Sequence, residues 1–396
     1  MSSLEFSQQA MAHLRADTPG VSQVIHLNNA GAALMPEVVG NAVLKYIRHE
    51  MKYGGYETAE KFRSKIDLAY DHIAHYLSCS PSEIAICENA TTAWDQAFLS
   101  IPLESKDEIL CSAAEYASNY IPFLQLAKRT GVQIRTIPNN EYGQVDINAL
   151  ERLINDRVKL IAITHVPTNG GLVNPACKIG QIAKRHQVWY LLDACQSVGQ
   201  MPLNVREIGC DFLSATSRKY LRGPRGVGFL FARQETTGSL EPIILDLHAA
   251  SWKSEQEYEI RADARKYENW ETNLSGVVGL GAAVGYMLDI GIDRIWARIQ
   301  LLADYLRSRL STVPGVRVHD LGKTKCGIVS FSSPRDALEL KKLLNEGSIN
   351  VSVIHPSHTL IDMQSRGLGH LIRASVHYYN TEEEIDTFIE YLKHVV

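Results

Sequence analysis

The chain has 396 residues, too many for one simple core and enough for a large α/β domain with a smaller domain beside it. Hydrophobic residues make up 45% and charged residues 21% of the chain, which is typical of soluble globular proteins. The formal net charge is −4 and the basic residues form no block. This argues against nucleic acid as a partner, because phosphates are neutralised by clustered Lys and Arg.

The cysteines and the apolar segments bear on where the protein works. The seven cysteines are scattered without a CxxC pair, so the sequence predicts neither a disulfide framework nor a zinc site and favours a reducing compartment. The first 20 residues are polar and lack the apolar core of a signal peptide. The longest apolar segment, residues 276–290, is too short for a membrane span and contains four glycines. We therefore expect a cytoplasmic protein without a membrane partner.

The first elements along the chain are helical. Residues 3–15 predict a short amphipathic helix. Residues 26–36, HLNNAGAALMP, predict a short strand followed by a loop of small residues. Residues 37–76 are helical apart from YGGY at residues 53–56, where the two glycines are expected to break the helix and expose two tyrosines.

Strands and helices alternate from residue 83 onward. Apolar runs that fit strands occur at residues 83–87, 108–111, 133–137, 160–165 and 189–193. Helical patterns lie between them, at residues 93–100, 121–130, 147–153 and 177–186. Continuous apolar runs indicate strands buried on both faces, and hence a parallel sheet covered by helices. Ligands of such sheets bind at the carboxyl ends of the strands.

The pattern changes after residue 231. Helices are predicted at residues 276–289, 294–310, 337–346 and 382–395. Strands are predicted at residues 316–319, 327–331, 349–354 and 371–376. This mixture predicts an α+β domain. We divide the chain into an N-terminal segment that packs on the small domain, a large domain and a small C-terminal domain, at residues 1–25, 26–275 and 276–396.

Residues 211–231, DFLSATSRKYLRGPRGVGFLF, predict a strand, a polar turn rich in glycine and a second strand. Lys219 lies in this turn, directly after Arg218. A lysine among apolar strands can lose its charge on burial and act as an amine nucleophile towards an aldehyde. The alternative is a surface turn whose polar side chains face water.

Asp193 ends the apolar strand WYLLD. A buried carboxylate is costly unless it meets a cation or a strong donor, such as a metal ion or a protonated ring nitrogen. A metal ion needs several ligands, and only His165 lies at a comparable strand end. A metal hydrolase that uses His165, Asp193 and His186 is therefore the weaker interpretation. A ring nitrogen needs a single carboxylate, and pyridoxal-type cofactors combine this pairing with a lysine.

Residues 88–92, ENATT, join a strand to the start of a helix. Free N–H groups and the positive end of the helix dipole favour an anion at this place, and the hydroxyls of Thr91 and Thr92 add donors. The alternative is that these hydroxyls only cap the helix. Together with Thr216 and Arg218 they form the predicted phosphate site. The combined pattern of lysine, carboxylate and phosphate site indicates pyridoxal 5′-phosphate as the cofactor and no metal.

Five longer motifs run through the chain. They are HLNNAGAALMP, ENATTAWDQA, THVPTNGGLVNP, YLLDACQSVGQMPLNVREIGCDFLSATSRKYLRGPRGVGFLF and IRASVHYYNTEEEID. These motifs resemble the class V aminotransferase and cysteine desulfurase family of fold-type I pyridoxal enzymes, and the resemblance covers most of the chain. It implies a large cofactor-binding domain with a mostly parallel sheet of seven strands, and a smaller α+β C-terminal domain.

The resemblance also implies roles for individual residues. Lys219 takes the place of the lysine that holds the cofactor and shuttles protons, and Asp193 that of the ring-nitrogen partner. The cofactor-binding residues that it implies are Thr91, Thr92, Tyr116, Asp193, Gln196, Thr216, Arg218, Lys219 and Thr272. The substrate-binding residues that it implies are Asn29, Asn169 and Arg373. Among these, Arg373 matches the arginine that binds the substrate carboxylate.

Four of the implied roles concern the surroundings of the cofactor. Tyr116 is expected to stack on the pyridine ring, and Gln196 to hydrogen-bond its phenolic oxygen. Arg218 stands where many relatives have histidine. Members of the family are homodimers with shared active sites, and Thr272 is expected to give its hydroxyl to the phosphate site of the other subunit.

One departure from the family pattern concerns sulfur. Cysteine desulfurases carry a cysteine on a mobile loop ahead of the motif matched by IRAS, whereas residues 349–371 here contain none, and Cys326 fits a core thiol. The resemblance therefore favours relatives without that cysteine, which are C–S lyases, epimerases and aminotransferases. Two fragments, RHEMKYGGYETAE and SRKYLRGPRGVGFL, are most similar to C–S lyases such as the ergothioneine-biosynthesis sulfoxide lyase.

The sequence thus predicts a pyridoxal-dependent enzyme that acts on an amino acid. The predicted reaction is β-elimination at the C–S bond of a cysteine conjugate or cysteine sulfoxide. The alternatives are amino-group transfer, epimerisation at Cα, and a desulfurase-like protein that lacks the loop cysteine. A protein that binds the cofactor without catalysis is a further alternative. The expected partners are a small amino-acid substrate and a second copy of the chain.

Overall fold

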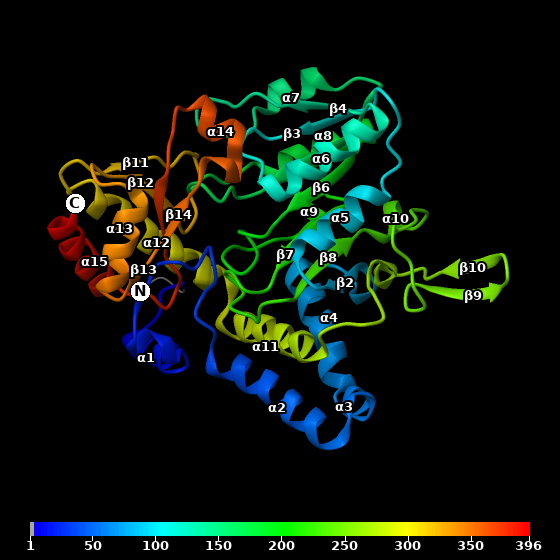
Figure 1. The fold of residues 1–396 in the computed structure, drawn as a ribbon, viewed down its shortest axis with the longest axis horizontal. Coiled ribbons are helices and arrows are strands. Elements are labelled where there is room, and N and C mark those ends of the chain that lie inside the picture. Colours follow the sequence, from blue (N-terminus) through cyan, green and yellow to red (C-terminus); the bar gives the residue numbers. More distant parts are fainter. Residues whose placement is uncertain (1–3) are drawn as a thin grey trace.

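A mixed sheet of seven strands forms the centre of the larger part of the molecule (Figure 1). The computed structural model describes residues 4–396. The strands of this sheet are β2 (Ile84–Cys87), β3 (Glu108–Cys111), β4 (Gln133–Thr136), β5 (Val158–Thr164), β6 (Trp189–Asp193), β7 (Phe212–Thr216) and β8 (Gly228–Ala232). Their order is β2-β8-β7-β6-β5-β3-β4, and β8 alone runs antiparallel to its neighbours. The mostly parallel sheet of seven strands is confirmed.

The central strands are apolar throughout because both faces of the sheet are covered. In β6, Tyr190 and Leu192 belong to the hydrophobic cluster on one face, whereas Leu191 belongs to the cluster on the other. The helices of this part are α2 (Glu37–Tyr53), α3 (Gly55–Lys61), α4 (Arg63–Leu77), α5 (Ala90–Ser100), α6 (Ala117–Thr130), α7 (Ile147–Leu153), α8 (Ala176–His186), α9 (Val205–Ile208) and α10 (Gln234–Thr237). The break predicted at YGGY separates α2 from α3, and Tyr53 and Tyr56 are exposed there.

The C-terminal part contains a second, antiparallel sheet with the order β11-β12-β15-β14. Its strands are β11 (Arg317–Val318), β12 (Ile328–Ser332), β14 (Ser352–Ile354) and β15 (Leu371–Ser375). Its helices are α12 (Ile292–Leu310), α13 (Ala337–Glu346), α14 (Leu360–Ser365) and α15 (Glu382–Val395). The side chain of Thr381 and that of Glu384 form a capping box at the start of α15.

The N-terminal segment lies against the C-terminal part of the chain. After α1 (Gln8–Ala16), the short strand β1 (Ile25–His26) pairs in parallel with β13 (Ile349–Asn350). Arg15 donates to the carbonyl of Tyr379 at 2.8 Å and forms an ion pair with Glu384 at 2.7 Å. The N-terminal segment is thus connected to the C-terminal part of the chain by both main-chain and side-chain contacts.

Helix α11 (Leu274–Ile290) is apolar because it is packed inside the protein. It lies against α2 and α4 (Figure 1), and a Cβ at Gly281 would come within 3.0 Å of Ala69 on α4. The glycines of α11 thus allow close helix packing. Within residues 4–396, no single helix has the length and apolar composition of a membrane span. Helices α11 and α12 reach this length and composition only when they are counted as one segment, and the angle between them is 80°.

A hairpin of β9 (Ala250–Ser254) and β10 (Glu257–Ile260) is the main element missing from the sequence-based prediction. It projects from the body of the protein (Figure 1). Its residues are mostly exposed, and the side chain of Trp252 is 81% exposed. Because neither face of this hairpin is buried in the chain, its sequence lacks the apolar run by which the other strands were predicted.

Candidate active site

A cavity of about 250 Å³ opens at the carboxyl ends of the central strands β5, β6 and β7. Seven of the predicted cofactor-binding residues line it, and these are Thr91, Tyr116, Asp193, Gln196, Thr216, Arg218 and Lys219. These residues therefore meet at the edge of the sheet where parallel strands bind ligands.

Lys219 reaches this cavity from the turn between β7 and β8. The residues that follow it are buried and anchor the turn, with Tyr220 and Arg222 each 2% exposed. The guanidinium of Arg222 donates to the hydroxyl of Thr18 at 2.6 Å and to the carbonyl of Leu34 at 2.8 Å. Lys219 therefore projects from a fixed support. The alternative of a solvated surface turn does not apply.

The surroundings of Lys219 favour its neutral form. Burial lowers the pKa of its amine below the ordinary lysine value, and the nearby cations Arg218 and Arg373 lower it further, against the opposing effects of Cys195 and Asp193. A neutral amine is the nucleophilic form of lysine. The site thus supplies an amine suited to capture an aldehyde.

Asp193 lies at the end of β6 with 5% of its surface exposed. One carboxylate oxygen accepts the backbone N–H of Cys195 at 2.8 Å, and the other accepts the side-chain N–H of Asn119 at 2.8 Å. These donors hold the carboxylate in place while it faces the cavity. Both Asn119 and Cys195 line the cavity, and the sequence analysis assigned neither of them a role.

His165, the other residue at a strand end that was considered as a metal ligand, is buried and does not line the cavity. His165 is 6% exposed, its Nδ1 has no hydrogen-bond partner among the described residues, and burial lowers its pKa to about 4. His186 lies on the surface and pairs with Glu151 at 2.7 Å. Residues 4–396 contain no group of three or more His, Cys, Asp or Glu arranged to hold a metal ion.

The start of α5 forms the anion-binding end of the cavity. Asn89 caps this helix by accepting the N–H of Thr92 at 3.0 Å, while Ala90 and Thr91 line the cavity. Arg218 and Arg225 line it as well, so two cations face the helix start. This combination suits a phosphate group. Thr92 lies outside the lining, and the helix is capped by the side chain of Asn89 and not by a threonine hydroxyl.

Gln196 presents an unsatisfied amide to the cavity. Its Nε2 donates to the carbonyl of Ala30 at 3.1 Å, while its buried Oε1 has no hydrogen-bond partner among the described residues. One end of the amide is therefore available to a ligand atom. Tyr116, the N-cap residue of α6, lines the same cavity.

Arg373, on the C-terminal sheet, does not itself line the cavity but contacts a residue that does. It lies on β15, is 7% exposed and donates through Nη1 to both the hydroxyl and the carbonyl oxygen of Thr168, which lines the cavity. Its Nε has no hydrogen-bond partner among the described residues. Burial lowers the pKa of Arg373 to about 10, which still leaves it charged at neutral pH. A buried cation with a free donor suits a carboxylate.

The two predicted substrate-binding asparagines lie elsewhere. Asn29 is fully buried, accepts the hydroxyl of Tyr379 and donates to the carbonyl of Ser375 at 2.7 Å, so its amide is already used within the fold. Asn169 donates to Asp362 of α14 at 2.7 Å and is absent from the cavity lining. Both side chains join parts of the chain to one another, which explains why they do not meet the cavity.

Thr272 is separate from the cofactor cavity of its own subunit. It lines a second cavity of about 600 Å³, together with Tyr56 of α3 and Glu268. That its hydroxyl contributes to the phosphate site of a partner subunit stays a prediction.

The residues of the smaller cavity fit pyridoxal 5′-phosphate. A buried lysine, a fixed carboxylate, an aromatic ring, a free amide end and an anion site lie around one space of suitable chemistry. Together with the mixed seven-stranded sheet, they define a pyridoxal-phosphate-dependent enzyme of fold type I.

Comparisons with known proteins agree with this class. The family described as Aminotransferase class-V matches residues 25–388. A probable cysteine desulfurase of Methanothermobacter thermautotrophicus is 30% identical over 390 residues, which cover 96% of this chain and 97% of the relative. The chain therefore belongs to the class V aminotransferase family, and its cofactor is pyridoxal 5′-phosphate.

Two solved structures place the fold within this family. The apo cysteine desulfurase from Thermococcus onnurineus NA1 superposes with a TM-score of 0.90 at 26% identity, covering 97% of this chain and 98% of that chain. A cystine C-S lyase in complex with its reaction product cysteine persulfide has a TM-score of 0.85 at 23% identity, covering 95% and 99%. The second likeness shows the fold alone. Because proteins with either activity share this fold, the reaction must be inferred from the site.

Proposed function

We propose that the chain catalyses β-elimination at the C–S bond of a cysteine conjugate or a cysteine sulfoxide. The supporting observation is the distribution of cysteines. The last cysteine in the sequence is Cys326, and the segment ahead of the IRAS motif has none. A desulfurase transfers the substrate sulfur to a cysteine thiol of the enzyme. A chain without that thiol is better suited to a reaction in which the sulfur leaves the substrate as part of the leaving group.

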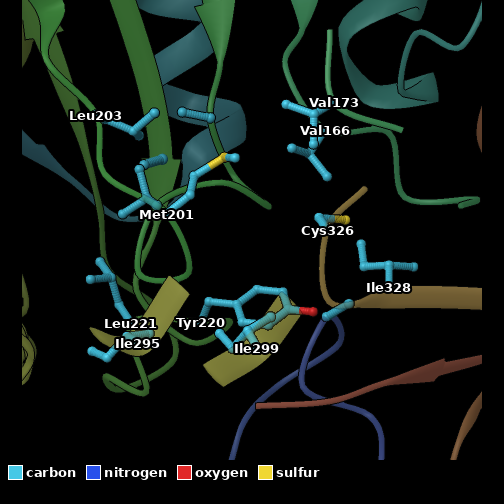
Figure 2. Close-up of a cluster of buried hydrophobic side chains, with 14 of the residues drawn as sticks. Val166, Val173, Met201, Leu203, Tyr220, Leu221, Ile295, Ile299, Cys326 and Ile328 are labelled. Carbon is cyan, nitrogen blue, oxygen red and sulfur yellow. The ribbon is translucent and has the colours of Figure 1, made fainter. Parts of the chain in front are cut away.

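The remaining thiols near the site are poor sulfur acceptors. Cys326 is fully buried beside Val166, Val173 and Ile328 (Figure 2), and burial raises its pKa to about 12. Cys195 lines the cavity, but burial and the nearby Asp193 raise its pKa well above the ordinary thiol value. The thiolate is the nucleophilic form of cysteine. Neither side chain is therefore poised to attack a substrate sulfur.

The chain's own residues can perform the steps that β-elimination requires. Bound pyridoxal phosphate supplies an electron sink that makes the Cα proton of an amino acid acidic. The Nζ of Lys219 is the group that takes this proton, because its lowered pKa favours the neutral amine. Arg373 would bind the substrate carboxylate, and Asp193 would hold the protonated ring nitrogen of the cofactor. The balanced products are pyruvate, ammonia and the sulfur-containing leaving group, with one water consumed.

The test is to incubate the holoenzyme with S-substituted cysteines and their sulfoxides and to measure pyruvate. The proposal requires pyruvate in amounts equal to the released thiol or sulfenic acid. Transfer of the amino group to a keto acid without pyruvate would support the aminotransferase alternative. Exchange of the Cα proton with inversion, again without pyruvate, would support an epimerase. Alanine formed from cysteine would support a desulfurase.

We also propose that two copies of the chain share their active sites. Large apolar side chains that are more than half exposed gather on α2, α3 and residues 243–270, and these are Met51, Tyr53, Tyr56, Ile243, Ile244, Leu247, Trp252, Tyr258 and Trp270. An exposed apolar surface of this extent is typical of an interface. The second cavity, which contains Thr272 and Tyr56, lies within the same region.

Hybrid dimers test this arrangement. Lys219→Ala and Thr272→Ala chains would be unfolded together, refolded and assayed. If Thr272 serves the partner, each hybrid contains one intact site, and activity exceeds that of either variant alone. If Thr272 serves its own subunit, no site is intact, and mixing restores nothing.

A further inference from the structure

A second buried carboxylate, Glu115, lies directly behind Asp193. It belongs to the loop between β3 and α6, is 3% exposed and does not line the cavity. Neither Glu115 nor Asp193 forms an ion pair with any side chain in residues 4–396. Two buried carboxylates without a paired cation are costly, so a role for the second one is required.

The hydrogen bonds around Glu115 all come from donors. Oε2 accepts the hydroxyl of Ser112 at 2.8 Å and the backbone N–H of Thr164 at 3.0 Å. Oε1 accepts the hydroxyl of Thr164 and the side-chain N–H of Asn119 at 3.1 Å. An ionised carboxylate can only accept, and these four donors can satisfy its two oxygens. Burial, and to a smaller degree the charge of Asp193, raise the pKa of Glu115 to about 7 against the effect of these donors.

Asn119 connects the two carboxylates. Its Nδ2 lies 3.1 Å from Oε1 of Glu115 and 2.8 Å from Oδ2 of Asp193. An amide nitrogen carries two hydrogens, so it can give one to each acid. The position of Asp193 is thereby coupled to Glu115 through a group that cannot ionise.

Glu115 also fixes the loop that carries the aromatic ring of the site. The hydroxyl of Thr164, which donates to Glu115, accepts the backbone N–H of Tyr116 at 3.3 Å. Tyr116 and Asn119 both line the cavity. One carboxylate therefore holds Tyr116 and Asn119, two of the three cavity residues at the start of α6, and, through Asn119, the acid at the end of β6.

We propose that Glu115 is a positioning residue for the pyridine nitrogen of the cofactor. Glu115 aligns Asn119 and Asp193 on that nitrogen, and its negative charge, added to that of Asp193, helps the nitrogen to keep its proton. A cationic ring nitrogen would in turn provide a nearby counter-charge for these two carboxylates, neither of which forms a direct ion pair within residues 4–396. This role applies to any reaction of the bound cofactor. A result that rules out this role of Glu115 can therefore be distinguished from a result that rules out the lyase reaction.

The experiment compares Glu115→Gln, Glu115→Asp and the surface control Glu151→Gln. The dissociation constant of pyridoxal 5′-phosphate is measured on each apo protein, and the ¹⁵N chemical shift of the labelled ring nitrogen is measured on each holo protein at one neutral pH. Removing the charge is expected to weaken cofactor binding about tenfold and to move the shift towards the unprotonated nitrogen. Glu115→Asp should recover part of both effects, and the control should resemble the wild type.

A double-mutant cycle tests whether Glu115 acts through Asp193. In an Asp193→Ala background, Glu115→Gln should weaken cofactor binding much less than in the wild type. An unchanged nitrogen shift in Glu115→Gln, or an undiminished loss of affinity in the Asp193→Ala background, would overturn the proposal. If Glu115→Gln does not fold, Glu115→Ala is measured in its place, because it also removes the charge and keeps the bond between Asn119 and Asp193. An unchanged nitrogen shift in that variant would overturn the proposal.

Discussion

The two sides of the cofactor cavity gather their polar residues in different ways. On one side, Asp193 is the last residue of β6 and Lys219 follows β7. These two strands are parallel neighbours, so the sheet alone brings the two residues together. On the other side, Arg373 comes from the C-terminal sheet and reaches the cavity through Thr168. The first arrangement depends on strand order, whereas the second depends on how two parts of the chain pack. Substitutions on the two sides should therefore differ in their effects on chemistry and on substrate binding.

The largest effect is expected for Lys219→Ala. Loss of the amine removes the group that holds the cofactor and moves the Cα proton, so kcat should fall about 10³-fold or more. Steady-state kinetics and the absorption spectrum of the holo protein measure this change. Retention of both the activity and the lysine-bound spectrum would place the essential amine elsewhere. Lys178→Ala, on the outer helix α8, provides the control.

A smaller and different effect is expected for Arg373→Gln on the opposite side. The substrate carboxylate loses a buried charge-assisted donor, so KM should rise about 100-fold while the cofactor remains bound. Arg373→Lys should lie between this variant and the wild type, because it keeps the charge and loses the planar geometry. A fall in kcat with an unchanged KM would contradict the assigned role of Arg373.

Asn29→Ala should alter stability and leave substrate binding unchanged. The substitution leaves the buried carbonyl of Ser375 without its side-chain donor, which should lower the free energy of unfolding by about 1–3 kcal/mol. Denaturant unfolding and the KM of the folded enzyme distinguish this result from a role in binding. A higher KM at unchanged stability would restore the substrate-binding role that the family resemblance implied.

The smallest effect is expected at the anion-binding end, where Thr91 and Thr92 can be compared. Thr91→Ala removes a hydroxyl from the cavity and should weaken the binding of pyridoxal 5′-phosphate about threefold to tenfold. Thr92→Ala should bind it as the wild type does, since that residue lies outside the lining. Equilibrium dialysis of both apo variants provides the measurement, and the reverse order of affinities would contradict the placement of Thr91 in the cavity and of Thr92 outside it.

The sequence alone predicted the position of a residue well where that residue lies at the end of a clearly recognisable strand. Strand β6 has the predicted bounds, and its last residue, Asp193, faces the cavity as expected. Asn119 was missed because α6 was predicted to begin at residue 121, whereas it begins at Ala117 and so contains Asn119 in its first turn. Helix starts depend on capping and loop contacts, which apolar periodicity does not report.

Three further residues have surroundings that the sequence did not reveal, and the physical reason is the same for all of them. Glu115 lies in a short polar loop, and nothing in its local sequence shows that the loop is buried behind Asp193. Asn29 and Asn169 are polar residues in recognisable motifs, yet both are used in contacts over long sequence distances, to Ser375 and Asp362. Such contacts are formed by tertiary packing, so a local pattern can indicate that a residue matters without indicating what it touches.

The pairing of β1 with β13 has a consequence for how the protein is made. Ile25 emerges from the ribosome early, but its strand partner Ile349 is added 324 residues later. At ordinary rates of synthesis this interval is on the order of tens of seconds. The N-terminal segment must wait unpaired during this time, and the ion pair between Arg15 and Glu384 forms only when translation is nearly complete. A nascent chain stalled before residue 349 should therefore have a protease-sensitive N-terminus.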